Sequence, residues 1–270
     1  MSSYGLGHHE SVLRSHQWRT AQNSAAYLLP RLSEGDRVLD VGCGPGTITA
    51  DLADVVGAAG SVIGVDNSPE VIEQAHERHR VRARGNLGFE VGNAMGLGYG
   101  EHSFDVAHAH QVLQHLQDPV GALQEFRRVV RPGGTVAIRE ADYAAMTWYP
   151  ASDGLDEWLA LYRQVAQSNG AEPDAGRRLL AWGSAAGFAE VLPSASAWCF
   201  ATPEERVWWG GLQADRILES AVAQQAVKLG LANVEDLRRM AAAWQNWAAT
   251  PTGWFAVLHG EILCRKAGAA

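Results

Sequence analysis

A glycine-rich turn between two apolar segments is the feature of this chain best suited to hold a ligand. Gly42, Gly44 and Gly46 follow the run R-V-L-D-V at 37–41 and open a helical pattern. Glycine lacks a Cβ atom, so a ligand can lie directly against the backbone amides at the positive end of that helix. Cys43 lies within the same turn and is expected to share these contacts.

An acidic residue lies at the end of the next apolar run. Asp66 closes S-V-I-G-V-D, twenty residues after Gly46. A carboxylate at the end of the second strand of a βαβ unit can accept hydrogen bonds from both hydroxyls of a ribose. Asn67 and Ser68 follow it and are expected to border an adenine ring, although Asp66 could instead cap the next helix together with Ser68. The order of strand, turn, helix, strand and acid predicts an adenosine-type ligand.

The spacing of the glycines narrows the choice of ligand. Dinucleotide-binding turns read G-x-G-x-x-G and hold a pyrophosphate, whereas here the third glycine comes one residue earlier and Pro45 lies in the turn. Asp40 precedes the first glycine, where a carboxylate would repel a pyrophosphate and suits a cationic ligand; its alternative role is to cap the turn. The turn therefore disfavours a nicotinamide-dependent oxidoreductase, which is retained as an alternative function.

Four segments resemble the class I S-adenosylmethionine-dependent methyltransferases. They are 38–49, G-V-D-N-S-P-E at 64–70, F-D-V-A-H-A-H-Q-V-L-Q-H-L at 104–116, and L-Q-E-F-R-R-V-V-R-P-G-G-T-V at 123–136. The likeness covers roughly residues 1–142 and lies within the subgroup similar to ubiquinone/menaquinone-biosynthesis methyltransferases. It implies that S-adenosyl-L-methionine is the cofactor. A non-catalytic protein that binds this cofactor is the second alternative.

The resemblance also implies contacts for the two ends of the cofactor. It places the glycine turn and Asp40 near the methionine portion. After the third predicted strand the family usually has an acid that accepts the adenine amino proton; this chain has Asn93, whose amide oxygen can accept that bond without charge assistance. Ala94 would donate a backbone N–H to the ring. Met95 would pack on its face, or fill the core instead.

Three residues after the fourth predicted strand are candidates for the reaction itself. His110 and Gln111 fall at the carboxyl edge of the sheet, where open α/β folds bind ligands. His115 resembles a family position near the transferred methyl group. A histidine with a pKa near neutrality can remove the proton of a phenol, alcohol or carbon acid. Each histidine could equally be a hydrogen-bonded structural residue.

The segments that must position these residues form four predicted units. Residues 1–30 form an N-terminal helical lid, read as one helix or two short ones, in which Arg19 pairs with the cofactor's carboxylate or lies on a solvated face. Residues 31–202 form a Rossmann-like, doubly wound α/β core. Residues 203–250 are a helical cap inserted before the closing strand. Residues 251–270 carry that strand, which the family fold places antiparallel to its neighbours.

The elements of the core follow from its alternating apolar periodicities. Strands are predicted at 37–41, 61–66, 87–91, 104–109 and 134–140, and helices at 46–57, 69–80 and 118–130. Two further short strands are predicted near 188–192 and 197–200.

The composition of the chain argues against several classes of binding partner. The net charge is −8 and no basic stripe is present, which argues against nucleic acid. No run approaches the roughly 20 apolar residues of a membrane span, and the three scattered cysteines lack metal-ligand spacing. We expect a cytoplasmic enzyme of secondary metabolism without a metal. Its methyl acceptor would be a small hydrophobic metabolite, uncharged or cationic, bound by some of the ten tryptophans. The methylated atom (O, N, S or C) and a homodimeric state are left open.

Overall fold

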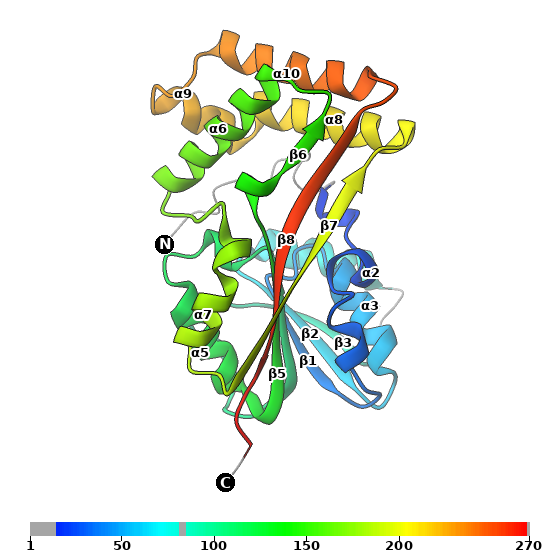
Figure 1. The fold of residues 1–270 in the computed structure, drawn as a ribbon. Helices are drawn as coiled ribbons and strands as arrows, with labels where there is room; N and C mark the ends of the chain where they lie inside the picture. Colours follow the sequence, from blue (N-terminus) through cyan, green and yellow to red (C-terminus); the bar gives the residue numbers. More distant parts are fainter. Residues whose placement is uncertain (1–14, 81–84, 269–270) are drawn as a thin grey trace.

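The computed structural model describes residues 15–80 and 85–268 and is built around one central sheet (Figure 1). Five parallel strands lie in the order β3-β2-β1-β4-β5. Their bounds are β1 (Arg37–Val41), β2 (Ser61–Asp66), β3 (Leu87–Val91), β4 (Phe104–His110) and β5 (Val130–Ala141). The predicted doubly wound, Rossmann-like sheet is confirmed.

The last strand, β8 (Trp254–Arg265), is antiparallel to its neighbours, as the resemblance implied. It pairs with β5 along one edge and with β7 (Glu190–Phe200) along the other. Its first residues pair with β6 (Thr147–Tyr149), which extends the sheet beyond the end of β5.

The prediction of two separate strands near 188–192 and 197–200 was wrong, because β7 pairs with β8 without interruption. The residues P-S-A-S between the two predicted strands were interpreted as an interruption of the strand. In the structure, however, Ser194 and Ser196 donate hydrogen bonds of 2.7 and 2.5 Å to the carboxylate of Glu261 on β8. Their hydroxyls therefore reinforce the strand pair.

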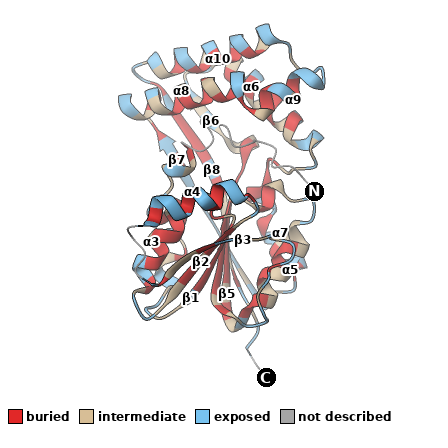
Figure 2. Ribbon diagram, turned by 180° about the vertical axis from the view of Figure 1, so that it is seen from behind, coloured by how far each residue is buried: buried red, intermediate tan, exposed pale blue. Residues whose placement is uncertain are grey.

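Helices cover both faces of the sheet, with their exposed sides turned outward (Figure 2). On one side lie α3 (Thr47–Val56) and α4 (Pro69–His79), and on the other α5 (Pro119–Val129) and α7 (Leu179–Ala185). The ends of the three predicted helices differ from α3, α4 and α5 by one residue at most. Strand alternation explains the two layers, because Val38 packs with α3 and its neighbour Leu39 packs with α5.

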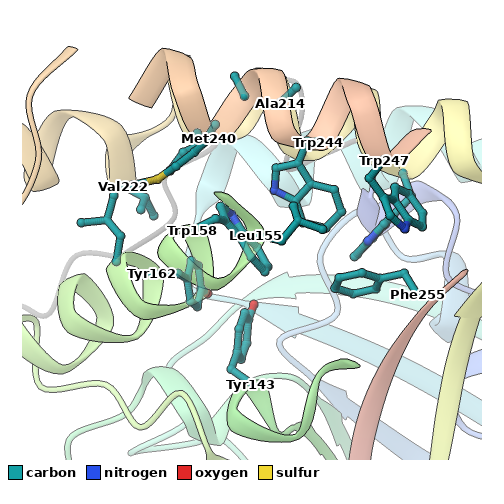
Figure 3. Close-up of a cluster of buried hydrophobic side chains, with 14 of the residues drawn as sticks. Tyr143, Leu155, Trp158, Tyr162, Ala214, Val222, Met240, Trp244, Trp247 and Phe255 are labelled. Atoms are coloured by element: carbon teal, nitrogen blue, oxygen red, sulfur yellow. The ribbon is translucent and has the colours of Figure 1, made fainter. Parts of the chain in front are cut away.

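A second helical layer lies beyond the carboxyl ends of the parallel strands (Figure 1). It contains α6 (Asp153–Ser168), α8 (Pro203–Glu219), α9 (Ala221–Lys228) and α10 (Val234–Ala249), which we call the cap. Figure 3 shows part of its apolar interior, where Trp158, Trp244 and Trp247 gather around Phe255. Besides the helices of the predicted cap insertion at 203–250, this layer contains α6, which precedes β7 in the sequence and packs against α10 and α9.

The N-terminal segment is less regular than a single helix. Thr20 caps a short α2 (Ala21–Ser24), and η1 (Leu29–Arg31) follows it. Three other short 3₁₀ turns complete the described elements: η3 (Leu113–His115), η4 (Tyr143–Ala145) and η5 (Ala175–Arg178). The first 14 residues of the predicted lid lie outside the described part of the chain. Among the described residues, no helix is both long and apolar enough to cross a membrane.

Candidate functional site

A cavity opens at the carboxyl edge of the sheet, between the ends of β1, β2 and β4 and the N-terminal segment. We call it the first cavity. Most of the predicted site residues line it: Arg19, Asp40, Gly42, Cys43, Gly44, Asp66, Asn67, Asn93, Ala94, His110, Gln111 and His115. His16 and Val112 also contribute to its wall. The fold thus brings together predicted residues from five separate segments of the chain.

Asp66 fixes the glycine turn to the end of β2. Its Oδ2 accepts a 3.1 Å hydrogen bond from the amide of Gly44, and its Oδ1 accepts one of 3.1 Å from the amide of Ser68. Ser68 in turn caps α4 through its hydroxyl, which accepts from the amide of Val71. Asp66 thus borders the cavity and supports the helix cap, and its contact with a ribose stays a prediction.

Two glycines of the turn adopt a backbone conformation that other residues rarely take. Gly42 has φ +70° and Gly44 has φ +55°. A Cβ atom at Gly42 would lie 2.3 Å from Val112 Cγ2, whereas the nearest atom to a Cβ at Gly44 would be His16 Nδ1 at 3.7 Å. Gly42 thus permits close packing against the loop after β4, and Gly44 leaves the backbone open toward the cavity.

Asp40 lies in the wall of the first cavity with both carboxylate oxygens engaged. Thr49 Oγ1 donates to Oδ2 at 2.6 Å, and His108 Nδ1 donates to Oδ1 at 2.8 Å. Asp40 is buried, with an exposed fraction of 3%. Its side chain is therefore held in one position behind the glycine turn.

His110 is a buried histidine on the cavity wall. Its exposed fraction is 4%, and neither ring nitrogen has a hydrogen-bond partner among the described residues. Burial, followed by the positive charges of Arg19 and Arg139, holds the pKa of His110 well below its usual range. The imidazole is neutral near pH 7, so one of its nitrogens can accept a proton or a hydrogen bond from a ligand.

A chain of hydrogen bonds positions Arg19. The Nη2 of Arg19 donates to Gln111 Oε1 at 2.6 Å, and Gln111 Nε2 donates to His259 Nε2 at 2.9 Å. His259 Nδ1 then donates to the carbonyl of Val257 at 3.0 Å. This arrangement holds the partly buried side chain of Arg19 at the cavity wall.

A second cavity lies between the sheet and the cap. Six of its fourteen lining residues are aromatic. The lining comes from the N-terminal segment, the loop after β4, β5, η4 and the residue after it, α6, β7, α8 and β8: Ser15, Trp18, Arg19, Gln111, Ala141, Tyr143, Met146, Trp158, Tyr162, Trp198, Trp209, Gln213, Arg216 and Val257. Arg19 and Gln111 line both cavities. The two spaces therefore meet at this hydrogen-bonded pair.

Comparison with known proteins now assigns the family. Residues 32–202 match the family model described as a methyltransferase domain. This chain is a methyltransferase. Along 97% of its length it is 37% identical to an uncharacterized methyltransferase of Schizosaccharomyces pombe, of which it covers 96%. It is also 37% identical over 115 residues to a demethylmenaquinone methyltransferase of Lactococcus lactis, which corresponds to 43% of this chain and 46% of that protein.

A solved structure shares the fold of the methyltransferase. It is phosphoethanolamine N-methyltransferase 2 of Haemonchus contortus, in complex with phosphomonomethylethanolamine and S-adenosylhomocysteine. The TM-score is 0.61 at 17% identity, with 96% of this chain and 58% of that chain covered. The expected class I family, its enzymatic character and its cofactor, S-adenosyl-L-methionine, are confirmed.

Three predicted cofactor contacts do not line the first cavity of the methyltransferase: Gly46, Ser68 and Met95. Ser68 is buried as the cap of α4. The side chain of Met95 is largely exposed, and its amide donates to Asn93 Oδ1 at 3.0 Å. The side-chain oxygen of Asn93, which was predicted to accept a hydrogen bond from the adenine amino group, thus already accepts one from the Met95 amide. Its second lone pair is left for a ligand.

Gly46 has a structural task instead. It begins α3 with φ +77°, and a Cβ atom there would lie 2.4 Å from Phe89 Cε1 on β3. The missing side chain lets the first turn of α3 pack on the sheet. The sequence could not separate this task from a ligand contact, because both require glycine.

Replacing Gly46 with Ala should therefore lower the free energy of unfolding by about 2–4 kcal/mol, through overpacking and backbone strain. Gly35→Ala is the matched control: its φ is +93°, but nothing lies within 4 Å of a Cβ atom. It should cost about 1 kcal/mol from backbone strain alone. Urea unfolding of both variants measures the difference, and equal losses would show that the contact with Phe89 is unimportant.

Sequence reasoning missed two polar residues that support the site. Glu140, at the end of β5, accepts hydrogen bonds of 2.9 and 2.7 Å from the amides of Val112 and Leu113, and burial raises its pKa to about 8. It thereby holds the loop that carries His115. Burial lowers the pKa of His115 to about 4, which makes it a weak base near neutral pH. The other missed residue is His259; a histidine inside the apolar run at 253–266 was the available signal.

Proposed function

We propose that this methyltransferase transfers the methyl group of S-adenosyl-L-methionine to an O, N, S or C atom of a small hydrophobic metabolite. The observation that carries the proposal is the meeting of two cavities at Arg19 and Gln111. The first has the turn and acid suited to an adenosine-type cofactor, and the second has aromatic walls suited to an apolar acceptor.

The residues of the first cavity fit the cofactor. Gly44 leaves the backbone open, and the carboxylate of Asp66 is oriented by two amides at the mouth of β2. In our proposal Asp66 accepts the ribose hydroxyls, Asn67, Asn93 and Ala94 border the adenine, and the turn from Gly42 to Gly44 faces the methionine portion. The side chain of Asp40 lies behind that turn, held by hydrogen bonds from Thr49 and His108.

The bound cofactor supplies a methyl group on a positively charged sulfur. Since methyl transfer is an in-line displacement that removes this charge, the chain's own residues chiefly position the acceptor and exclude water. Arg19, fixed by Gln111, orients groups at the boundary of the two cavities. Where the acceptor is a phenol, an alcohol or a carbon acid, neutral His110 accepts its proton.

We also propose a role for each segment of the chain. Residues 1–30 form the lid, 31–202 the methyltransferase core, 203–250 the cap insertion and 251–270 the closing strand. The apolar cluster shared by α6, α8, α9 and α10 extends the functional cap to include α6. A role in secondary metabolism, a cytoplasmic location and a homodimeric state stay predictions from the sequence.

A small hydrophobic acceptor is also supported by the relative from Lactococcus lactis, whose name specifies demethylmenaquinone. The test is calorimetric titration with S-adenosylhomocysteine and with NADH, followed by a turnover screen of phenols, amines and thiols. We expect saturable S-adenosylhomocysteine binding and sustained release of this product with at least one acceptor class. Binding of NADH alone would indicate an oxidoreductase, and cofactor binding without turnover on any acceptor would indicate a non-catalytic binding protein.

A further inference from the structure

Gln111, which follows β4, has a backbone conformation that residues other than glycine rarely adopt. Its φ is +56°, and among the described residues the other non-glycine residue with a positive φ is His102, at +62°. In this left-handed region the Cβ atom lies too close to the following carbonyl oxygen, so the residue is strained. Strained residues persist where the surrounding structure fixes them, and they cluster at functional sites.

Hydrogen bonds to β5 hold the backbone around Gln111 in place. The amide of Gln111 donates to the carbonyl of Arg139 at 2.8 Å. The next two amides, of Val112 and Leu113, donate to Glu140 Oε1 at 2.9 and 2.7 Å. Three consecutive amides are thus held by two neighbouring residues of one strand. Relaxation of Gln111 to a negative φ would disturb these bonds, and buried amides need partners.

The positive φ also places the side chains of His110 and Gln111 on the same face of the sheet. Along an extended strand, successive side chains point to opposite faces. Here both approach His259 of β8: the ring centroids of His110 and His259 lie 5.9 Å apart, and Gln111 Nε2 lies 2.9 Å from His259 Nε2. The break in alternation thereby brings two neighbouring polar side chains together beside one partner.

The side-chain amide of Gln111 links two segments that lie far apart in the sequence. Its Oε1 accepts a 2.6 Å hydrogen bond from Arg19 of the N-terminal segment, and its Nε2 donates to His259 of the closing strand. Since Gln111 and Arg19 line both cavities, this link lies at their boundary. A shorter side chain could not reach both partners.

Resting on the proposed function, we propose that Gln111 is a positioning residue for methyl transfer. Its left-handed backbone directs the amide to the boundary of the two cavities, where it holds Arg19 and His259 beside the path from the methyl donor to the acceptor. The chain keeps a strained residue at this position, at the expense of stability, because a relaxed backbone would turn the amide away from that path.

The test first separates the backbone of Gln111 from its side chain. Gln111→Gly relieves the strain and removes the amide, whereas Gln111→Ala removes the amide and keeps the strain. Unfolding of the full-length protein in urea should therefore have a higher midpoint for the Gly variant than for the Ala variant.

Turnover then measures the role of the amide. The probe is the phenol, amine or thiol with the highest turnover in the screen of wild type, used with saturating S-adenosyl-L-methionine. We expect both variants to lower kcat about tenfold or more, since a small misplacement of reacting groups can cost about 10²-fold. Calorimetric affinity for S-adenosylhomocysteine should fall by a smaller factor. A merely structural role would lower stability and leave the kcat of the folded enzyme unchanged.

His102 supplies the matched control. It shares the positive φ, is exposed, and lies outside both cavities. His102→Gly should also be more stable than His102→Ala, but both variants should keep the wild-type kcat.

Three results would overturn the proposal: a wild-type kcat in both Gln111 variants, equal losses of kcat and S-adenosylhomocysteine affinity, or a midpoint for Gln111→Gly no higher than that for Gln111→Ala. Should Gln111→Ala fail to fold, Gln111→Asn replaces it. Asn tolerates the left-handed region but carries its amide on a side chain one methylene shorter. It should fold and still lose kcat about tenfold, and a wild-type kcat there would overturn the proposal too.

Failure of the proposed function is distinct from all of these results. In that case wild type itself would not bind S-adenosylhomocysteine, or would turn over no acceptor in the screen.

Discussion

Replacing His110 with Ala is expected to lower kcat about 10²-fold when the acceptor is a phenol, an alcohol or a carbon acid. General-base catalysis by a positioned histidine contributes about 10²–10⁴-fold, and the lowered pKa of His110 makes it a weaker base, which places the effect at the low end of that range. Affinity for S-adenosylhomocysteine should change much less. Steady-state turnover and calorimetric titration of the same preparation measure the two effects. A thiol or neutral amine can attack without losing a proton first, so the drop in kcat also identifies the class of acceptor.

The pH dependence of stability supplies a check on the state of His110. Its pKa lies well below 6.5 in the folded chain and near 6.5 in the unfolded chain. Below pH 6.5 the unfolded chain therefore binds more protons, and the stability that neutral His110 provides is lost as the pH falls. Wild type should therefore lose more stability than His110→Ala between pH 7 and pH 5, as measured by urea unfolding at the two pH values. Equal losses of kcat and cofactor affinity, or no loss of either, would mean that His110 is structural.

Replacing Asp66 with Ala should weaken binding of S-adenosylhomocysteine by about 1–3 kcal/mol, the range for hydrogen bonds to a charged group. The loss has two sources: the proposed contact with the ribose, and the amide of Gly44, which would no longer be held at 3.1 Å. Calorimetry measures the affinity.

Ser68→Ala separates these sources from a general loss of structure. It removes the cap of α4 but leaves the carboxylate in place, because Asp66 accepts from the backbone amide of Ser68. It should cost about 1 kcal/mol of stability and little affinity. An unchanged affinity in Asp66→Ala would remove Asp66 from the site.

The parts of the site that could be predicted from the sequence are those fixed by neighbours along the chain. The glycine turn and Asp66 each follow a short apolar strand, and such strands meet at one sheet edge. Contacts between residues that lie far apart in the sequence could not be predicted. Gly46 packs on Phe89 of β3, and Gln111 is held by His259, which lies 148 residues further along the chain.

Burial accounts for other properties of the site that could not be predicted from the sequence. The pKa values of His110 and His115 are lowered by desolvation, which the residue types alone do not reveal. The position of Arg216 in the lining of the second cavity depends on the packing of α8 against α10 and β7, which the local pattern does not encode.

The uninterrupted pairing of β7 with β8 joins the cap to the sheet. All eleven residues of β7 are paired, and the two strands run from the foot of the sheet up to the cap helices (Figure 1). Backbone N–H and C=O groups that leave such a pair need new partners. A displacement of the cap that separates β7 from β8 would therefore cost backbone hydrogen bonds, which couples the position of the cap to the core sheet.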